Sequence, residues 1–143
     1  MKHEIKPAKP EHLQCIIDLC EVCGLSGRDI TLLQKNIDRP DYLMLVMLRD
    51  EAVAGFIEAQ FITDEIHLYD VAVAPAQRRK GIAQALVESL VREPFTVILL
   101  EVREANLAAQ RLYEQCGFLV DGVRRNYYSA PVENAVLMSR EIS

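Results

Sequence analysis

The spacing of apolar and polar residues divides the chain into alternating predicted helices and strands. A helical period marks four segments, Glu11–Val22, Gly27 to about Asp38, Gly81–Arg92 and Asn106–Cys116. Short, largely apolar runs predict strands at Ile5–Ala8, Tyr42–Arg49, Ala52–Ile62, Glu65–Val73, Phe95–Val102, Leu119–Arg125 and Ala135–Arg140. The order β-α-α-β-β-β-α-β-α-β-β predicts an α/β fold, with a mixed central β-sheet flanked by helices on both faces.

Local features sharpen this pattern. The turn Arg49-Asp50-Glu51 joins two apolar runs and predicts a β-hairpin, while Gly24 and Gly117 are the expected ends of two helices. The run Phe95–Val102 is almost continuously apolar, which is typical of a strand buried on both faces. With 143 residues and neither a repeat nor a linker, the chain is expected to form a single domain over residues 1–143.

Charge and hydropathy narrow the class of partner. The formal net charge of −5 argues against a nucleic-acid partner, which requires a basic face, and suits a cationic one better. No apolar run approaches the roughly 20 residues that span a bilayer, so no membrane partner is expected. Residues 1–5 lack the apolar core of a signal peptide, and we therefore expect a cytoplasmic protein.

The cysteines allow a metal-binding alternative. Cys15, Cys20 and Cys23 show the C-x4-C-x2-C spacing of plant-type iron–sulfur ligation, with Cys116 far downstream. However, Cys20 falls on the same apolar helix face as Leu13, and buried free thiols are common in protein cores. We therefore expect reduced cysteines, with neither a metal nor a structural disulfide.

The segment from Val71 to Leu86 is the strongest candidate for a binding site. An apolar strand leads into a loop marked by proline, then into basic residues and Gly81 at the start of an amphipathic helix. Helix starts present unpaired backbone N–H groups and a partial positive charge, which suit a phosphate. Gly81 and the small Ala83 would let a bulky anion approach the backbone closely.

Further polar residues follow in the second half of the chain. Glu101 lies near the end of an apolar strand, where a carboxylate is costly unless it is paired, hydrated or used, although it also suits a strand end at the surface. Asn106 is placed either to cap a helix or to hydrogen-bond an amide-bearing ligand. If Leu112 and Cys116 serve the core, Tyr113 is free to point its hydroxyl toward a cleft.

Together these motifs resemble a known family. Residues 78–83, Arg-Arg-Lys-Gly-Ile-Ala, match the R/Q-x-x-G-x-G/A acetyl-CoA signature of the GNAT N-acetyltransferase superfamily. Residues 100–106 and 112–118 are similar to its second half, and the resemblance covers essentially the whole chain. The likeness is greater to the ribosomal-protein-alanine N-acetyltransferases (RimI type), because residues 124–128 read Arg-Arg-Asn-Tyr-Tyr.

The resemblance implies a single-domain GNAT fold, acetyl-CoA as co-substrate and roles for individual residues. Glu101 would be the general base and Tyr113 the general acid of a direct transfer that needs no metal. Residues at the strand end would offer their backbone to the pantetheine, and the loop would hold the pyrophosphate. The cofactor-binding residues implied are Val71, Ala72, Val73, Arg78, Arg79, Lys80, Gly81, Ile82, Ala83, Gln84 and Asn106.

The acceptor implied is the N-terminal α-amine of a protein such as a small-subunit ribosomal protein, with the enzyme acting as a monomer or homodimer. Acetylation of a small amine or a lysine side chain is an alternative, and a non-catalytic CoA-binding module is another. Tyr127 and Tyr128 would wall an open acceptor groove, and His67 would line the amine site or simply pack on its strand.

Two departures from the family pattern bear on the acceptor and the fold. Residues 23–26, Cys-Gly-Leu-Ser, replace the usual Phe-Pro-Trp-Ser-like motif of the peptide wall, and the chain contains no tryptophan. The link between Arg92 and Phe95 is also short for the family. The first departure concerns the acceptor, and the second only shortens a helix.

Overall fold

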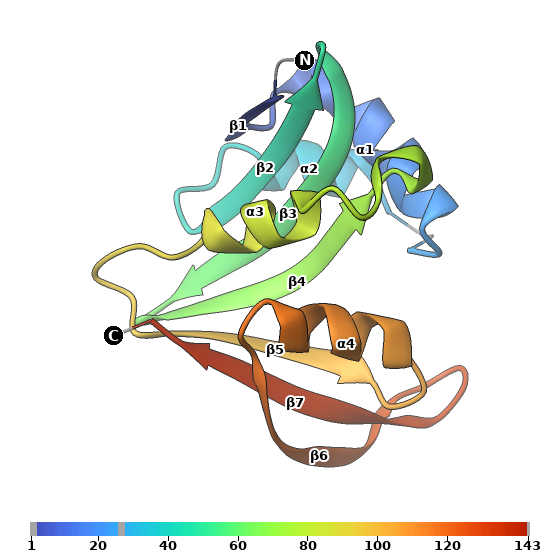
Figure 1. Cartoon of the computed structure of the whole chain (residues 1–143), viewed down its shortest axis with the longest axis vertical. Coiled ribbons are helices and arrows are strands. Elements are labelled where there is room, and N and C mark those ends of the chain that lie inside the picture. The colour runs from blue at the N-terminus through green and yellow to red at the C-terminus, as the bar shows by residue number, and fades with distance from the viewer. Residues whose placement is uncertain (1–2, 26–27, 143) are drawn as a thin grey trace.

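Seven strands of the computed structural model form one mixed sheet with helices on both faces, within the described residues 3–25 and 28–142 (Figure 1). The strands are β1 (His3–Pro7), β2 (Tyr42–Arg49), β3 (Ala52–Ile62), β4 (Glu65–Val73), β5 (Val97–Arg103), β6 (Leu119–Tyr128) and β7 (Glu133–Glu141). The helices are α1 (Leu13–Val22), α2 (Ile30–Asn36), α3 (Ile82–Glu88) and α4 (Leu107–Gln115), with 3₁₀ turns η1 (Pro10–His12) and η2 (Pro75–Gln77). Among these residues no helix is long and apolar enough to cross a membrane.

The strands lie in the order β1-β2-β3-β4-β5-β7-β6, and only the β4–β5 pair among them is parallel within the described residues. In the view of Figure 1, α3 and α4 lie in front of the sheet and α1 and α2 behind it. The core beneath α3 and α4 includes Ile57, Ile66, Leu86, Ile98 and Phe118. The core beneath α1 and α2 includes Leu13, Ile16, Leu33, Val46 and Phe56. This architecture confirms the predicted α/β fold.

β4 and β5 pair only at their beginnings, where Glu65–His67 face Val97–Leu99. Beyond these positions β4 stays paired with β3 as far as Val73, whereas β5 stays paired with β7 as far as Arg103. The two strands therefore diverge toward their carboxyl ends, as Figure 1 shows. Each strand keeps its antiparallel partner, and only the parallel pairing between β4 and β5 ends here.

A β-bulge in β4 changes which face its residues occupy. Residues 58 and 59 of β3 pair with Asp70 and Leu68, so Tyr69 is the extra residue. Leu68 packs in the core beneath α3, and Val71 is the next residue of the strand to do so. Because side chains normally alternate, this odd spacing leaves Tyr69 and Asp70 together on the face of α1 and α2.

β5 is buried on one face, so the prediction that it is buried on both is wrong. Ile98, Leu100 and Val102 are buried beneath α3 and α4, whereas Leu99 and Glu101 are half-buried. In the described part of the chain, the core beneath α1 and α2 takes its sheet residues from β2, β3 and β4. No helix of that layer covers the outer face of β5 there, which leaves Glu101 accessible.

The ends of the elements differ from the prediction by a few residues. β1 begins at His3, and β6 continues to Tyr128. The predicted start of the second helix at Gly27 lies outside the described residues. Within them, α2 follows Asp29, whose side chain caps the helix by accepting a hydrogen bond from the Thr31 backbone N–H at 2.8 Å.

Candidate functional site

A pocket of about 1010 Å³ occupies the space between the diverging ends of β4 and β5. It gathers most of the residues singled out from the sequence, namely Val71, Ala72, Val73, Arg78, Arg79, Gly81, Ile82, Ala83, Gln84, Glu101, Asn106 and Tyr113. Lys80 is not among its lining residues, and its Nζ lies 3.3 Å from Oε1 of Gln77. Segments that are distant in sequence thus meet at one opening in the sheet.

The end of β4 presents backbone groups to this pocket. Val71–Val73 pair with β3 on one side, and on the other side β5 has diverged. In an antiparallel strand N–H and C=O groups point alternately to the two sides, so some of them are directed into the pocket. The Val73 carbonyl accepts hydrogen bonds from Arg78 Nε at 3.3 Å and from the Cys23 thiol at 3.4 Å. This backbone edge suits an extended, amide-bearing ligand.

The loop after β4 suits an anion. Arg79 and Gly81 both have positive φ angles, of 64° and 76°, and α3 begins directly afterwards at the buried Ile82. A Cβ built on Gly81 meets no atom within 4 Å, so the absence of a side chain leaves open space beside the backbone. The guanidinium groups of Arg78 and Arg79, the backbone N–H groups at the start of α3, which lack a partner within the helix, and this open glycine form a donor set that fits the phosphates of acetyl-CoA.

Glu101 and Tyr113 reach the pocket from opposite faces of the sheet. Glu101 alternates with the buried Leu100 and Val102 on β5, so it lies on the face away from α4. Tyr113 lies on α4 and packs edge-to-face against Phe118, with ring centroids 5.7 Å apart. A ligand between β4 and β5 would therefore have the carboxylate on one side and the phenol on the other.

Tyr113 is more deeply buried than the helical pattern predicts. Its side chain is 8% exposed, whereas Leu112, expected in the core, is half-buried and lines the pocket. The turn at Gly117 folds Phe118 back onto the phenol ring, which accounts for the difference. Burial raises the pKa of Tyr113 to about 12, so the phenol stays protonated at neutral pH.

Asn106 caps α4, one of the two roles left open by the sequence. Its Oδ1 accepts a hydrogen bond from the Ala109 backbone N–H at 3.1 Å. The residue also lines the pocket, so contact with a ligand stays a prediction.

Tyr128 lines the pocket beside Glu101, while Tyr127 is solvent-exposed. The guanidinium of Arg103 stacks over the Tyr128 ring at 4.3 Å. Burial raises the pKa of Tyr128, and the neighbouring phenol of Tyr127 and the carboxylate of Glu101 add to the rise. His67 lies farther down β4, with Nε2 3.5 Å from Oε1 of Glu65. The aromatic wall expected from the sequence thus consists of Tyr128 rather than both tyrosines.

All four cysteines are free thiols. Cys20 and Cys116 are buried, in agreement with the helical pattern, and Cys15 is exposed. The described residues contain no group of three or more histidine, cysteine, aspartate or glutamate side chains arranged to hold a metal ion.

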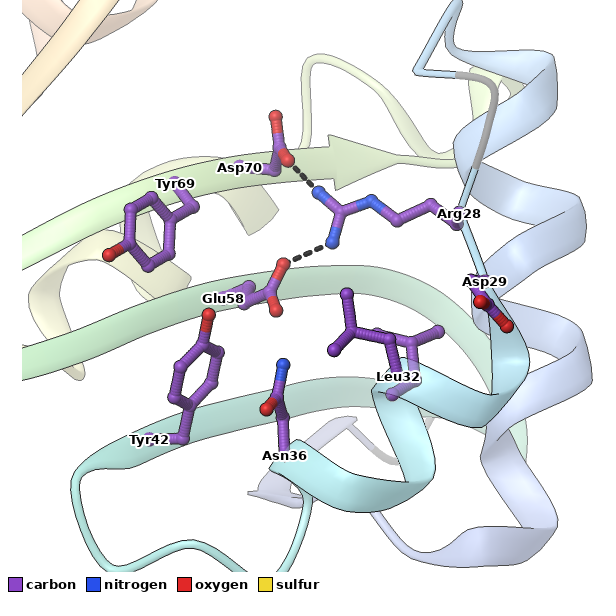
Figure 2. Close-up of a pocket in the computed structure, with 9 residues that line it drawn as sticks. Arg28, Asp29, Leu32, Asn36, Tyr42, Glu58, Tyr69 and Asp70 are labelled. Carbon is purple, nitrogen blue, oxygen red and sulfur yellow. Dashed lines mark hydrogen bonds and ion pairs between the residues drawn. The ribbon is translucent and has the colours of Figure 1, made fainter.

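A second pocket, of about 330 Å³, contains residues that the sequence analysis missed (Figure 2). Arg28 there forms ion pairs with both Glu58 and Asp70. The signal for Glu58 was a single carboxylate in the otherwise apolar middle of a strand, and the side chain is in fact buried. Tyr69 and Asp70 line both pockets, so the two adjoin.

Comparison with known proteins identifies the family and the fold. The model of the acetyltransferase (GNAT) family matches residues 13–118. The chain belongs to this family. A [ribosomal protein bS18]-alanine N-acetyltransferase from Salmonella typhimurium is 39% identical over 108 residues, which are 71% of this chain and 73% of that protein. The Escherichia coli K12 enzyme of the same name is 37% identical over 108 residues, with the same coverage.

Solved structures of GNAT proteins agree with this assignment. The crystal structure of the ribosomal-protein-S18-alanine N-acetyltransferase from Escherichia coli superimposes with a TM-score of 0.85 and 29% identity, over 99% of this chain and 95% of that one. An N-acetyltransferase from Thermoplasma acidophilum, solved with coenzyme A, shares the fold at a TM-score of 0.81 and 20% identity. The resemblance to GNAT N-acetyltransferases of the RimI type is therefore confirmed, and the chain is a GNAT N-acetyltransferase.

Replacing Tyr113 by Phe should remove a loss of stability at alkaline pH. Burial holds the pKa of this phenol at about 12, whereas an unfolded tyrosine titrates near pH 10. Between these values the unfolded chain releases the proton and the folded chain keeps it, so the free energy of unfolding falls by up to about 1.4 kcal/mol per pH unit. Urea unfolding of both proteins on either side of about pH 10 measures this slope, and equal slopes would contradict the burial.

Proposed function

We propose that this GNAT enzyme transfers the acetyl group of acetyl-CoA to the N-terminal α-amine of a protein, such as the small-subunit ribosomal protein named for its relatives. The observation that carries the proposal is the two-sided pocket, with Glu101 and Tyr128 on the face away from α4 and Tyr113 on the other. The 37–39% identity to bS18-alanine N-acetyltransferases supports this acceptor. A ribosomal acceptor would place the enzyme in the cytoplasm, with residues 1–143 acting as one catalytic domain.

The cofactor side of the pocket is formed by β4, the loop and the start of α3. Backbone groups of Val71–Val73 would hold the pantetheine arm, and one of their N–H groups would face the oxyanion that develops on the thioester carbonyl. Arg78, Arg79 and the backbone of Gly81–Gln84 would bind the phosphates. Asn106 would contact the arm through the amide nitrogen that its capping role leaves available.

Glu101 is the proposed general base. A protein α-amine has a pKa near 8, so much of it is protonated at neutral pH and must lose a proton before it attacks the thioester. The Glu101 carboxylate would accept that proton, directly or through a water molecule. A positioned base of this kind contributes about 10²–10⁴-fold to the rate.

Tyr113 is the proposed acid at the leaving sulfur. Its raised pKa of about 12 keeps the phenol protonated when the thiolate departs. Because an ordinary thiol has a pKa near 8.5, complete proton transfer from this phenol is uphill, and its main contribution is a hydrogen bond to the developing negative charge. Attack by the amine forms the amide bond and breaks the C–S bond in one ternary complex, so no residue of the chain becomes acylated.

A small amine or a lysine side chain is the second candidate acceptor. The observation in its favour is the sequence of residues 23–26, which lacks the bulky aromatic motif that forms the peptide wall in similar enzymes. Cys23, Gly24 and Leu25 line the large pocket at this point. A wall without a bulky aromatic residue here would make fewer contacts with a peptide.

A panel of acceptors tests the proposal directly. We expect rapid CoA release with a peptide that begins with a free alanine, and none when that terminus is blocked. CoA release only with polyamines, or only with N-terminally blocked peptides that contain lysine, would show an acetyltransferase with a different acceptor from the one proposed. Tight binding of acetyl-CoA, with no CoA release in the presence of any acceptor of the panel, would indicate a non-catalytic CoA-binding module.

Glu101→Gln should lower kcat by about 10²–10⁴-fold and alter its pH dependence, because the amide cannot accept the proton. The affinity for acetyl-CoA, measured by calorimetry, should stay within about twofold, since the proposed phosphate and pantetheine contacts are made by other residues. Unchanged turnover would remove Glu101 from the mechanism.

Gly81→Val should weaken acetyl-CoA binding by at least about tenfold, because a β-branched side chain at a positive φ would fill the open space beside the backbone. Gly117→Val is the matched control, since Gly117 also has a positive φ but lies outside the pocket. Both variants should lose stability, whereas only the first should lose affinity. Equal affinities for acetyl-CoA would show that the phosphates bind elsewhere.

A further inference from the structure

The small pocket is built around one arginine that joins three segments of the fold. Arg28, just before α2, reaches over the sheet and pairs through its two terminal nitrogens with Glu58 of β3 and Asp70 of β4 (Figure 2). The side chains of Arg28 and Glu58 are 16% and 6% exposed, and that of Asp70 is 27% exposed. This is a largely buried bridge, and it differs in kind from the exposed ion pairs of the surface.

The bridge is required by the register of the sheet. Glu58 and Asp70 lie directly opposite each other on neighbouring strands, and the bulge at Tyr69 turns Asp70 to the same face as Glu58. Two carboxylates in such positions repel each other, most strongly where water is excluded. The guanidinium of Arg28 offsets this repulsion, because its planar fork can serve both carboxylates at once. The same contact fixes the chain before α2 against the sheet.

The bridge also shapes the passage toward the large pocket. Leu32 and Asn36 of α2 form one side of the small pocket, and Tyr42 and Tyr69 form the other (Figure 2). The Tyr69 hydroxyl donates a hydrogen bond to Oε1 of Gln60 at 2.6 Å. Tyr69 lines the small pocket and also the large one, which Glu101 lines as well. Burial raises the pKa of Tyr69, and the carboxylate of Glu101 adds to that rise. Tyr69 therefore lies where the two pockets adjoin.

These contacts indicate a role for the Arg28 bridge, and this role rests on the function proposed above. We propose that Arg28 is a positioning residue for the acceptor: by bridging Glu58 and Asp70 it fixes the pocket that receives the side chain of the acceptor's second residue. An amine at Glu101 would lie on the same face of the sheet as Tyr69, and because Tyr69 and Asp70 line both pockets, the small pocket would adjoin the chain that follows the amine. The cofactor residues at the end of β4 and the start of α3 do not line this pocket.

The charge of the pocket indicates which side chains it accepts. Its lining carries three carboxylates, Asp29, Glu58 and Asp70, and one guanidinium, Arg28. The excess is negative, so an acidic side chain would meet repulsion, whereas an uncharged or basic one would not. Leu32 and the two tyrosine rings supply apolar surface for an aliphatic stem.

The test is a kinetic comparison of Arg28→Gln and Arg28→Lys with the wild type. With a peptide that begins with alanine, both variants should raise the acceptor KM by at least about tenfold, because a lysine cannot serve both carboxylates and a shift of about 1 Å in a positioning contact is costly. The KM for acetyl-CoA should stay within about twofold. Lys6→Gln is the control. It also removes one positive charge from an ion pair, but Lys6 and its partner Glu4 lie at the surface on β1.

A second readout separates positioning from general damage to the fold. Wild-type enzyme should prefer an alanine peptide whose second residue is glutamine over one whose second residue is glutamate, and Arg28→Gln should increase that preference, because it removes the only cation among the described residues that line the pocket. If Arg28→Gln fails to fold because Glu58 is left buried and charged, the double variant Arg28→Gln with Glu58→Gln removes that charge and should still show the raised acceptor KM. Asp70→Asn, at the more exposed arm, should act in the same direction.

The outcomes separate this inference from the function on which it rests. Wild-type enzyme that is inactive on α-amine peptides would overturn the proposed function, whatever the variants do. Active wild type, with acceptor KM values and discrimination unchanged in folded Arg28 variants, would overturn the positioning role alone. Equal rises in the KM of both substrates would also contradict it, because they would show a general structural defect.

Discussion

The divergence of β4 from β5 is the constraint on which the rest of the site depends. Both strands remain bound to an antiparallel partner, so their separation leaves no long unpaired edge except at the pocket itself. The backbone groups that lose a partner there are the ones available to a ligand. The loop after β4, Gly81, Glu101 and Tyr113 all lie around this one interruption of the sheet.

The interruption also divides the chemistry between two layers. The α3 and α4 layer supplies Tyr113 and the loop that suits phosphates, and the α1 and α2 layer supplies Arg28 and its pocket. Glu101 lies on the outer face of β5, which the helices of the second layer leave uncovered within the described residues. The half-buried strand thus differs from the fully buried strand that the apolar run Phe95–Val102 predicts, and only the half-buried strand lets the Glu101 carboxylate reach the large pocket.

Local patterns in the sequence were sufficient for the elements and for most of the large pocket. The strand, loop and glycine at 71–84 are contiguous, so their chemistry can be read without knowledge of the fold. The bulge at Tyr69 cannot be predicted in this way, since it depends on pairing with the partner strand. It places Asp70 on the opposite face of the sheet from the one that regular alternation of side chains predicts. Arg28 and Glu58 are 30 residues apart, and only the packing of α2 on the sheet joins them. The depth of Tyr113 similarly depends on Phe118 folding back after the helix.

The short parallel pairing between β4 and β5 has a mechanical consequence. Only three register positions join these strands, whereas β2–β3 and β3–β4 each share eight. The sheet is thus weakest along a seam that runs into the pocket, and local opening along this seam would separate the β1–β4 side from the β5–β7 side while each side keeps its own hydrogen bonds. A ligand bound across the gap would contact both sides, and its binding would thereby stabilise the molecule against opening along this seam.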